Sequence, residues 1–299
     1  MFKWLRYILD FLRNRIWGKK TTTTSTPVEI PIRPIQHNKK AVCIGINDYP
    51  GHRNDLKGCV NDAQGWYHIL QKTFGFTTPS LLLNSQAKKA TVLKELNHLV
   101  DKAKVGDVLA ITFSGHGTAK PDWSSNEADE PDSKDEAWCL YDGLLLDDDI
   151  RSIIKRLQEG VRLIVISDSC HSGTVTRAFL KSVGMEVYAK PRYMPPEDIA
   201  EANLLGGLKI KKRLFYSEEN MKEILISGCK ATEYSYDAKF NGKPMGALSH
   251  YALTVLKANP NMTYHQFYKN LRKSLPSRIH PQTPQLEGSE SNKKRRVFE

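Results

Sequence analysis

The chain has 299 residues, of which 40% are hydrophobic and 26% are charged, a composition typical of a soluble protein with one large or two small domains. Its five cysteines form an odd set without Cys-x-x-Cys spacing, which argues against a disulfide framework and a zinc cluster and favours a reducing, cytoplasmic setting. The net charge of +11 is concentrated in residues 1–20, 209–213 and 293–296, so we expect no nucleic-acid-binding core.

Residues 1–20 have the pattern of an amphipathic helix, with Trp and Leu on one side and Lys and Arg on the other. This pattern is typical of a helix lying in an anionic membrane interface. Docking on this protein or on a partner, and disorder, are the alternatives. Charges interrupt the segment too often for a membrane span, and no signal-peptide cleavage site follows it. Residues 21–38, rich in Thr and Pro, are predicted to be a flexible linker.

After this linker, short apolar runs alternate with amphipathic segments. We predict strands at 41–46, 81–83, 107–113, 137–141, 161–167, 222–229 and 283–286, and helices at 59–74, 91–104, 147–159, 247–257 and 263–275. Such alternation predicts an α/β fold with a parallel, doubly wound sheet. Residues 121–136 are predicted to be an acidic loop, and 179–220 an irregular, exposed linker that contains a basic run.

Two of the apolar strands end in side chains suited to nucleophilic catalysis. The run 107–113 breaks into Ser-Gly-His116-Gly, and the run 161–167 breaks into Asp-Ser-Cys170-His-Ser-Gly. Because the functional crevice of an open α/β sheet lies beyond the carboxyl ends of its strands, we expect Cys170 and His116 to meet as nucleophile and base. His171 is the alternative base, and a buried structural cysteine with a core histidine is the alternative without chemistry.

These two motifs resemble the signature blocks of the metacaspase and orthocaspase branch of the caspase-like cysteine peptidases (clan CD, peptidase family C14), in which a His lies about 50 residues before the Cys. The resemblance extends from about residue 40 to about residue 288. It implies the caspase-like fold, with a mostly parallel central sheet flanked by helices on both faces. A large catalytic part at 39–178 and a small part at 221–299 would complete one core, with the linker at 179–220 between them.

The resemblance also implies which residues bind the substrate. The backbone N–H groups of Gly117 and Cys170 would form the oxyanion hole. An acidic pocket would accept Arg or Lys before the scissile bond. The matching pocket positions are Cys59, Asp62, Ser114 and Asp168. A carboxylate pair in a partly desolvated pocket holds a guanidinium well, whereas a helix-start role for Asp62 and a turn role for Asp168 are the alternatives.

The basic run in the predicted linker offers residue types that such a pocket accepts. We therefore predict autoprocessing of a zymogen after Lys212 or Arg213, and a solvated charge run is the alternative.

The thiol chemistry requires no cofactor, but the resemblance raises the question of calcium activation. Asp135, Asp147 and Asp148 match the positions of calcium-binding acids, and their oxygens are ligands that Ca²⁺ prefers. The fourth expected acid is replaced by Arg177, whose charge would weaken such a site. Stabilisation of a helix start is the alternative role of Asp147 and Asp148.

The sequence thus predicts a monomeric cysteine endopeptidase that cuts proteins or peptides after Arg or Lys. We expect it in the cytoplasm, and peripheral at a membrane if residues 1–20 bind lipid. The alternative function is that of a catalytically silent or activator-gated scaffold that acts through residues 1–20. A third alternative is an enzyme that cuts after Asp. The absence of an arginine beside the two motifs argues against it.

Overall fold

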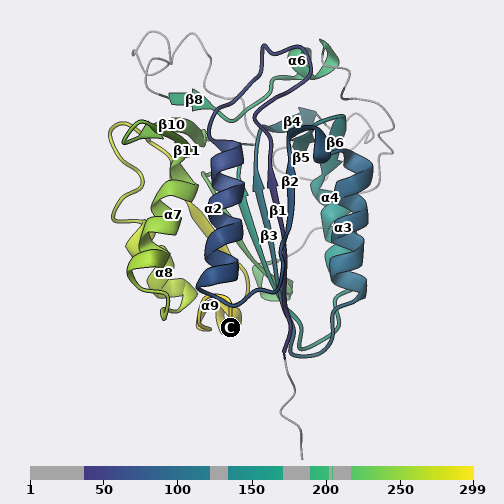
Figure 1. Ribbon diagram of the computed structural model, residues 1–299, viewed down its shortest axis with the longest axis vertical. Helices are drawn as coiled ribbons and strands as arrows, with labels where there is room; N and C mark the ends of the chain where they lie inside the picture. Colours follow the sequence, from purple (N-terminus) through teal and green to yellow (C-terminus); the bar gives the residue numbers. More distant parts are fainter. Residues whose placement is uncertain (1–36, 122–133, 171–188, 202–203, 205–216) are drawn as a thin grey trace, which may run out of the picture. The chain divides into compact units, whose positions relative to one another are not determined.

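A six-stranded sheet forms the centre of the fold, with the strand order β12-β9-β7-β3-β1-β2 (Figure 1). Its strands are β1 Lys39–Gly45, β2 Ser80–Leu83, β3 Val108–Ser114, β7 Arg162–Asp168, β9 Glu223–Ser227 and β12 Gln285–Glu287. The first five run parallel, and β12 pairs antiparallel with β9 at one edge. The computed structural model describes residues 37–121, 134–170, 189–201, 204 and 217–299, which all lie in one unit, His37–Glu299.

Successive side chains of the central strands point to opposite faces, and each face carries its own core. The helices are α2 Cys59–Lys72, α3 Lys89–Asp101, α4 Asp147–Ile154, α6 Pro196–Glu201, α7 Ala247–Ala258, α8 Tyr264–Leu271 and α9 Glu290–Lys293. In β1, Val42 and Ile44 belong to the core that contains α3 and α4, whereas Ala41 and Cys43 belong to the core that contains α2, α7 and α8 (Figure 1). The predicted fold class is therefore confirmed.

Two small sheets lie beyond the carboxyl ends of the central strands. One consists of β4 Gly117–Pro121, β5 Lys134–Leu140 and β6 Gly143–Leu146, and the other of β8 Ala189–Pro191, β10 Tyr236–Phe240 and β11 Lys243–Gly246. Both are antiparallel, in the orders β4-β5-β6 and β11-β10-β8. Of these six strands, the sequence patterns had predicted only β5.

The stretch 179–220 contains more structure than an irregular linker. Its described residues 189–201 form β8 and α6, and Ala189, Met194 and Ile199 are buried. These elements are short and interrupted by proline, so the sequence shows no clear helical or strand periodicity there.

Several sequence predictions concern residues outside the described part of the chain. They are the amphipathic helix at 1–20, most of the linker at 21–38 and of the acidic loop at 121–136, and the positions Arg177, Lys212 and Arg213. Among the described residues, each helix is too short or too polar to cross a bilayer.

Candidate functional site

The register of the central sheet brings the two sequence motifs to one edge. Strands β3 and β7 pair in parallel with Ser114 opposite Asp168, where both strands end. His116 and Cys170 each follow their strand end by two residues, so they leave the sheet at the same level. Both side chains are buried.

His116 is held by two residues of the loop between β1 and α2, Asn54 and Tyr49. Its Nε2 lies 2.7 Å from the backbone oxygen of Asn54, and its backbone N–H donates to the Tyr49 hydroxyl at 2.8 Å. The Tyr49 hydroxyl in turn donates to the backbone oxygen of Cys139 at 3.1 Å. Because a carbonyl oxygen only accepts, Nε2 carries the proton in the neutral ring, and Nδ1 is the nitrogen that can take up another.

Cys170 lies beside the backbone of Ser235. Its Sγ accepts from the Ser235 N–H at 2.6 Å and lies 3.2 Å from the Ser235 oxygen. Cys229 is a second buried thiol nearby, and its hydrogen bond with Cys170, together with burial, raises the pKa of Cys229 well above its ordinary value. Cys229 therefore stays protonated at neutral pH, which makes it a poor nucleophile.

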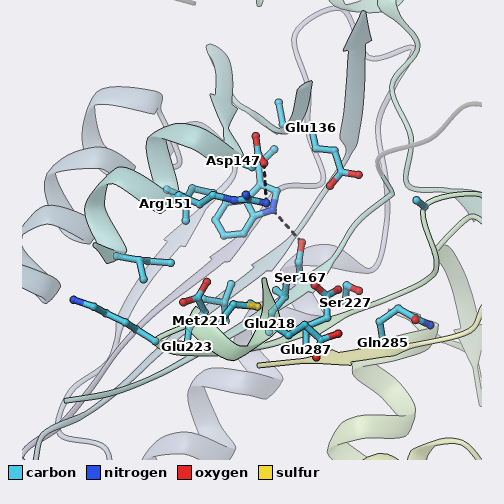
Figure 2. Close-up of a pocket in the computed structure, with 18 of the residues that line it drawn as sticks. Glu136, Asp147, Arg151, Ser167, Glu218, Met221, Glu223, Ser227, Gln285 and Glu287 are labelled. Atoms are coloured by element: carbon cyan, nitrogen blue, oxygen red, sulfur yellow. Dashed lines mark hydrogen bonds and ion pairs between the residues drawn. The ribbon is translucent and has the colours of Figure 1, made fainter. Parts of the chain in front are cut away.

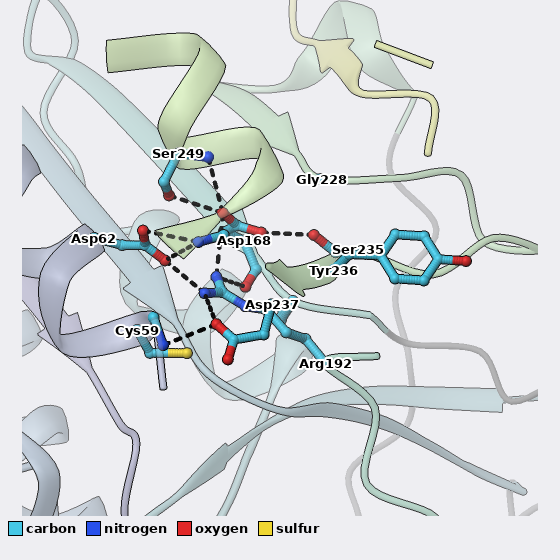
Figure 3. Close-up of polar contacts among 12 residues, drawn as sticks. Cys59, Asp62, Asp168, Arg192, Gly228, Ser235, Tyr236, Asp237 and Ser249 are labelled. Atoms are coloured by element: carbon cyan, nitrogen blue, oxygen red, sulfur yellow. Dashed lines mark hydrogen bonds and ion pairs between the residues drawn. The ribbon is translucent and has the colours of Figure 1, made fainter. Parts of the chain in front are cut away.

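The predicted acidic pocket contains an arginine from the chain itself. The guanidinium of Arg192 pairs with Asp62 at 2.6 Å, Asp168 at 3.1 Å and Asp237 at 3.0 Å (Figure 3). The Arg192 side chain is 0% exposed, and the three carboxylates are buried with it. The cluster is thus a dry, three-carboxylate site filled by one cation.

Further donors fix each carboxylate of this cluster. Asp168 accepts from the hydroxyl of Ser235 at 2.6 Å and from the backbone N–H and hydroxyl of Ser249 at 2.9 and 2.8 Å. Asp62 accepts from the backbone N–H of Gly246. Asp237 accepts from the backbone N–H groups of Lys57 and Gly58. Buried carboxylates held by several donors keep one orientation, so the pocket is preorganised for a planar cation.

Charge and burial act in opposite directions in this cluster. Burial acts to lower the pKa of Arg192, but the carboxylates, Asp168 foremost, raise it well above its ordinary value. Burial raises the pKa of Asp62 to about 7, and Asp168 and Asp237 add to that rise while Arg192 opposes it. The arginine therefore stays charged, and Asp62 is the member of the cluster that titrates near neutrality.

Two backbone amides of the site converge on one oxygen. The N–H groups of Gly117 and Cys170 both donate to the carbonyl oxygen of Arg192, at 3.0 and 3.2 Å. These are the two amides that the family resemblance implied as an oxyanion hole. In this structure they hold the carbonyl of the same residue whose side chain fills the acidic pocket.

The remaining predicted pocket positions, Cys59 and Ser114, are buried. In the described part of the chain, the ion pairs of Arg192 go to Asp62, Asp168 and Asp237 instead. Cys59 begins α2, where its backbone N–H donates to Asn47 Oδ1 at 2.8 Å and burial raises the pKa of its thiol. Sequence reasoning missed Asp237 and Arg192. The signal for Asp237 was the hairpin turn Asn-Gly at 241–242, which predicts a strand before it.

A second acid-rich region lies on the α4 side of the sheet (Figure 2). It is a cavity of about 430 Å³ whose lining includes Glu136, Asp147, Arg151, Ser167, Glu223 and Glu287. Burial raises the pKa values of Glu223 and Glu287, and the neighbouring carboxylates of Glu218 and Glu136 add to the rise for Glu287.

The described acids of the predicted calcium site have other contacts. Asp147 accepts from the N–H of Asp148 at the start of α4 and pairs with Arg151 at 3.3 Å. Nowhere in the described ranges do three or more His, Cys, Asp or Glu side chains gather as metal ligands would. The side chain of Asp135, the third acid of the predicted calcium site, lies outside the described residues.

Comparisons with known proteins show which family the chain belongs to. A sequence model described as metacaspase, peptidase C14 domain, matches residues 39–178. Metacaspase-1 of Ajellomyces capsulatus is 32% identical over 83% of this chain and 79% of the relative, and that of Emericella nidulans is 31% identical over 84% and 70%. Metacaspase-1 of Kluyveromyces lactis is 32% identical over 83% of this chain, which spans 65% of that relative.

Solved structures with a similar fold support the same assignment. A protein of Geobacter sulfurreducens superposes with a TM-score of 0.69 at 29% identity and covers 87% of this chain and 98% of its own. Caspase-1 of Spodoptera frugiperda superposes with a TM-score of 0.53 at 12% identity over 85% of this chain and 87% of its own, which supports the fold alone. The chain therefore belongs to the metacaspase family, within peptidase family C14.

Proposed function

We propose that this metacaspase is a cysteine endopeptidase that cuts on the carboxyl side of Arg, and less efficiently of Lys, with Cys170 as nucleophile and His116 as base. The observation that carries the proposal is the buried cluster of Asp62, Asp168 and Asp237, which fits a guanidinium closely. Three carboxylates against one cation favour a positively charged side chain and disfavour an acidic one.

The geometry also supports the order of chemical roles. The Cys170 thiolate would attack the carbonyl carbon of the residue in the pocket, while the N–H groups of Gly117 and Cys170 stabilise the developing oxyanion. The Asn54 carbonyl orients the ring of His116, which leaves Nδ1 to take the thiol proton and return it to the leaving amine. Arg is favoured over Lys because the pocket offers acceptors to several guanidinium N–H groups, whereas an ammonium is a point charge.

The proposed substrates are proteins or peptides with Arg or Lys before the cleaved bond. The proposed setting is the cytoplasm, where residues 1–20 would bring a monomeric enzyme to an anionic membrane or to a docking partner. The chemistry itself calls for no cofactor, and calcium would act as an activator.

Fluorogenic peptides that differ only in a terminal Arg, Lys or Asp test the proposal, with calcium and with a chelator. We expect hydrolysis in the order Arg, Lys, Asp, and a loss of about 1,000-fold or more in Cys170→Ala. The matched control is Cys43→Ala, which removes a buried thiol from the centre of β1 and should keep the activity. Equal activity in Cys170→Ala, or a preference for Asp, would contradict the proposal, and the chelator series decides the role of calcium.

A further inference from the structure

The segment around Arg192 crosses the site as an extended chain. Strand β8, Ala189–Pro191, pairs antiparallel with β10, with Lys190 opposite Asp237. The pairing continues through the Arg192 N–H, which donates to the Ser235 oxygen at 2.9 Å. Addition of a strand to a sheet edge is a common way in which proteins bind an extended peptide.

The backbone of the next residues is held from the opposite side. The Gly117 N–H donates to the Arg192 oxygen at 3.0 Å, and the Met194 N–H donates to the Gly117 oxygen at 2.9 Å. Gly117 and Tyr193 form a parallel bridge. The peptide bond between Arg192 and Tyr193 is thus fixed on both sides, next to the backbone of Cys170.

The Arg192 side chain fits its pocket without spare room. A Cβ atom at Gly246 would overlap with both Asp168 Oδ2 and Arg192 Nη1, so the absence of a side chain there is what lets the guanidinium enter. If Arg192 served only to stabilise the fold, the ion pairs of Figure 3 would be enough. Its backbone carbonyl oxygen would not also have to accept from the N–H groups of Gly117 and Cys170. Side chain, carbonyl and flanking strand together have the arrangement of a substrate.

From this arrangement we infer that the Arg192–Tyr193 peptide bond is a cleavage site of the chain itself, cut in cis by Cys170. The inference rests on the proposed function, because it requires a peptidase that accepts Arg. It differs from the sequence-based expectation of cleavage after Lys212 or Arg213, two residues that lie outside the described part of the chain.

The reaction balances with one water molecule. The Cys170 thiolate attacks the Arg192 carbonyl carbon, so a C–S bond forms and the oxygen becomes an oxyanion between two amides. Collapse breaks the C–N bond, and the thiol proton passes through His116 to the nitrogen of Tyr193, which leaves as an amine. Water then attacks the thioester, giving the Arg192 carboxylic acid and the free thiol, without oxidation or reduction.

The two products would stay together in the folded protein. Strands β9 and β12, helices α7 and α8 and their buried side chains come from the part after Tyr193, and they complete the central sheet and one of its two cores. Cleavage therefore leaves one particle in native conditions. Its consequence is that the segment 189–192, now with a free end, can leave the pocket and give way to other substrates.

The test follows the intact mass and the new N-terminus of the purified full chain. In the wild type we expect fragments that end at Arg192 and begin at Tyr193, and an intact chain in Cys170→Ala. Arg192→Lys should still be cut, whereas Arg192→Gln should lower the rate at this bond about 100-fold or more. The matched control is Lys190→Gln, two residues away, whose ammonium donates to the backbone oxygens of Arg53 and Asp55.

The possible results separate this inference from the proposed function, and Arg192→Lys and Lys190→Gln keep the test decisive if Arg192→Gln does not fold. An enzyme that hydrolyses the Arg peptide but never produces a Tyr193 N-terminus, or is cut only after Lys212 or Arg213, would overturn the inference and leave the function standing. A chain that neither cuts itself nor the peptide would overturn both. A half-time that changes in proportion on about tenfold dilution would overturn cleavage in cis, because an intramolecular step does not depend on concentration.

Discussion

Ser167 and Asp168 are consecutive residues at the end of β7, yet they face two different acid-rich regions. The Asp168 carboxylate points toward α7, into the cluster filled by Arg192 (Figure 3). The Ser167 hydroxyl points to the α4 side, where it accepts from Trp138 Nε1 at 3.0 Å beside the cavity of about 430 Å³ (Figure 2). The alternation of side chains along one strand thus separates the two regions.

The comparison shows that acidic residues alone do not identify a specific pocket. In the filled cluster each carboxylate accepts from at least two donors, and the guanidinium lies between them with 0% exposure. In the cavity, Glu223 and Glu287 have raised pKa values, and the basic groups of Arg151 and Lys222 stand on the same lining. Fixed donors and a nearby backbone carbonyl, rather than negative charge alone, distinguish the first region as the proposed binding site.

The largest expected effect comes from removing one charge from the filled cluster. Asp168→Asn places an amide N–H₂ group where the Ser249 donors and Arg192 already point, and it removes the carboxylate that pairs with Arg192 Nη1. We expect the free energy of unfolding to fall by about 3 kcal/mol and kcat/KM for Arg peptides to fall about 100-fold or more. Urea titration and peptide hydrolysis measure both.

Glu223→Gln is the matched change in the cavity, since it also neutralises a carboxylate, here a partly buried one, beside the same sheet. Its unfolding free energy and its kcat/KM should stay within about 0.5 kcal/mol and about twofold of the wild type. If Glu223→Gln were as damaging as Asp168→Asn, the distinction between a preorganised cluster and an acid-lined cavity would be wrong.

Most of the central sheet and the pairing of Cys170 with His116 at one edge could be predicted from the sequence. Short apolar runs predicted all six strands of the central sheet close to their observed bounds, because buried strands are rich in apolar residues. Two strands that end in a His and a Cys predicted the shared edge, which the register of Ser114 with Asp168 bears out.

The contents of the pocket could not be predicted in the same way. Asp237 and Arg192 come from β10 and from the end of β8, which are short, polar at alternate positions, and stabilised by partners distant in the sequence. The β10–β11 hairpin did leave a local signal, since Asn241 and Gly242 both have positive φ, as a tight hairpin turn requires. No local pattern marks Arg192, because only the assembled fold brings it to Asp62 and Asp168.

The pH dependence of stability tests the environment of Asp62 in the filled cluster. Its pKa of about 7 lies above the ordinary value of 3.8, so between about pH 4 and pH 7 the folded chain holds a proton that the unfolded chain has lost. This group therefore lowers the free energy of unfolding as the pH rises through that window, and its contribution is constant above about pH 7. We expect the stability of the wild type relative to Asp62→Asn to decline by a few kcal/mol across the window, measured by urea titration at several pH values. Parallel pH curves for the two chains would show that Asp62 ionises in the folded protein as easily as in water.

Among the changes expected to lower stability, the smallest effect comes from the wall of the cavity. Trp138→Phe removes the donor to Ser167 but keeps the stacking on Phe113, whose ring centroid lies 4.5 Å from that of Trp138. We expect the unfolding free energy to fall by about 1–2 kcal/mol, from a lost hydrogen bond and a smaller ring, with kcat/KM for Arg peptides unchanged within about twofold. The Ser167 hydroxyl also lies 2.9 Å from that of Ser169, the residue before Cys170. A loss of activity of about tenfold or more would therefore mean that this chain of hydroxyls positions Cys170, and that the cavity and the filled cluster act on the same reaction from opposite faces of the sheet.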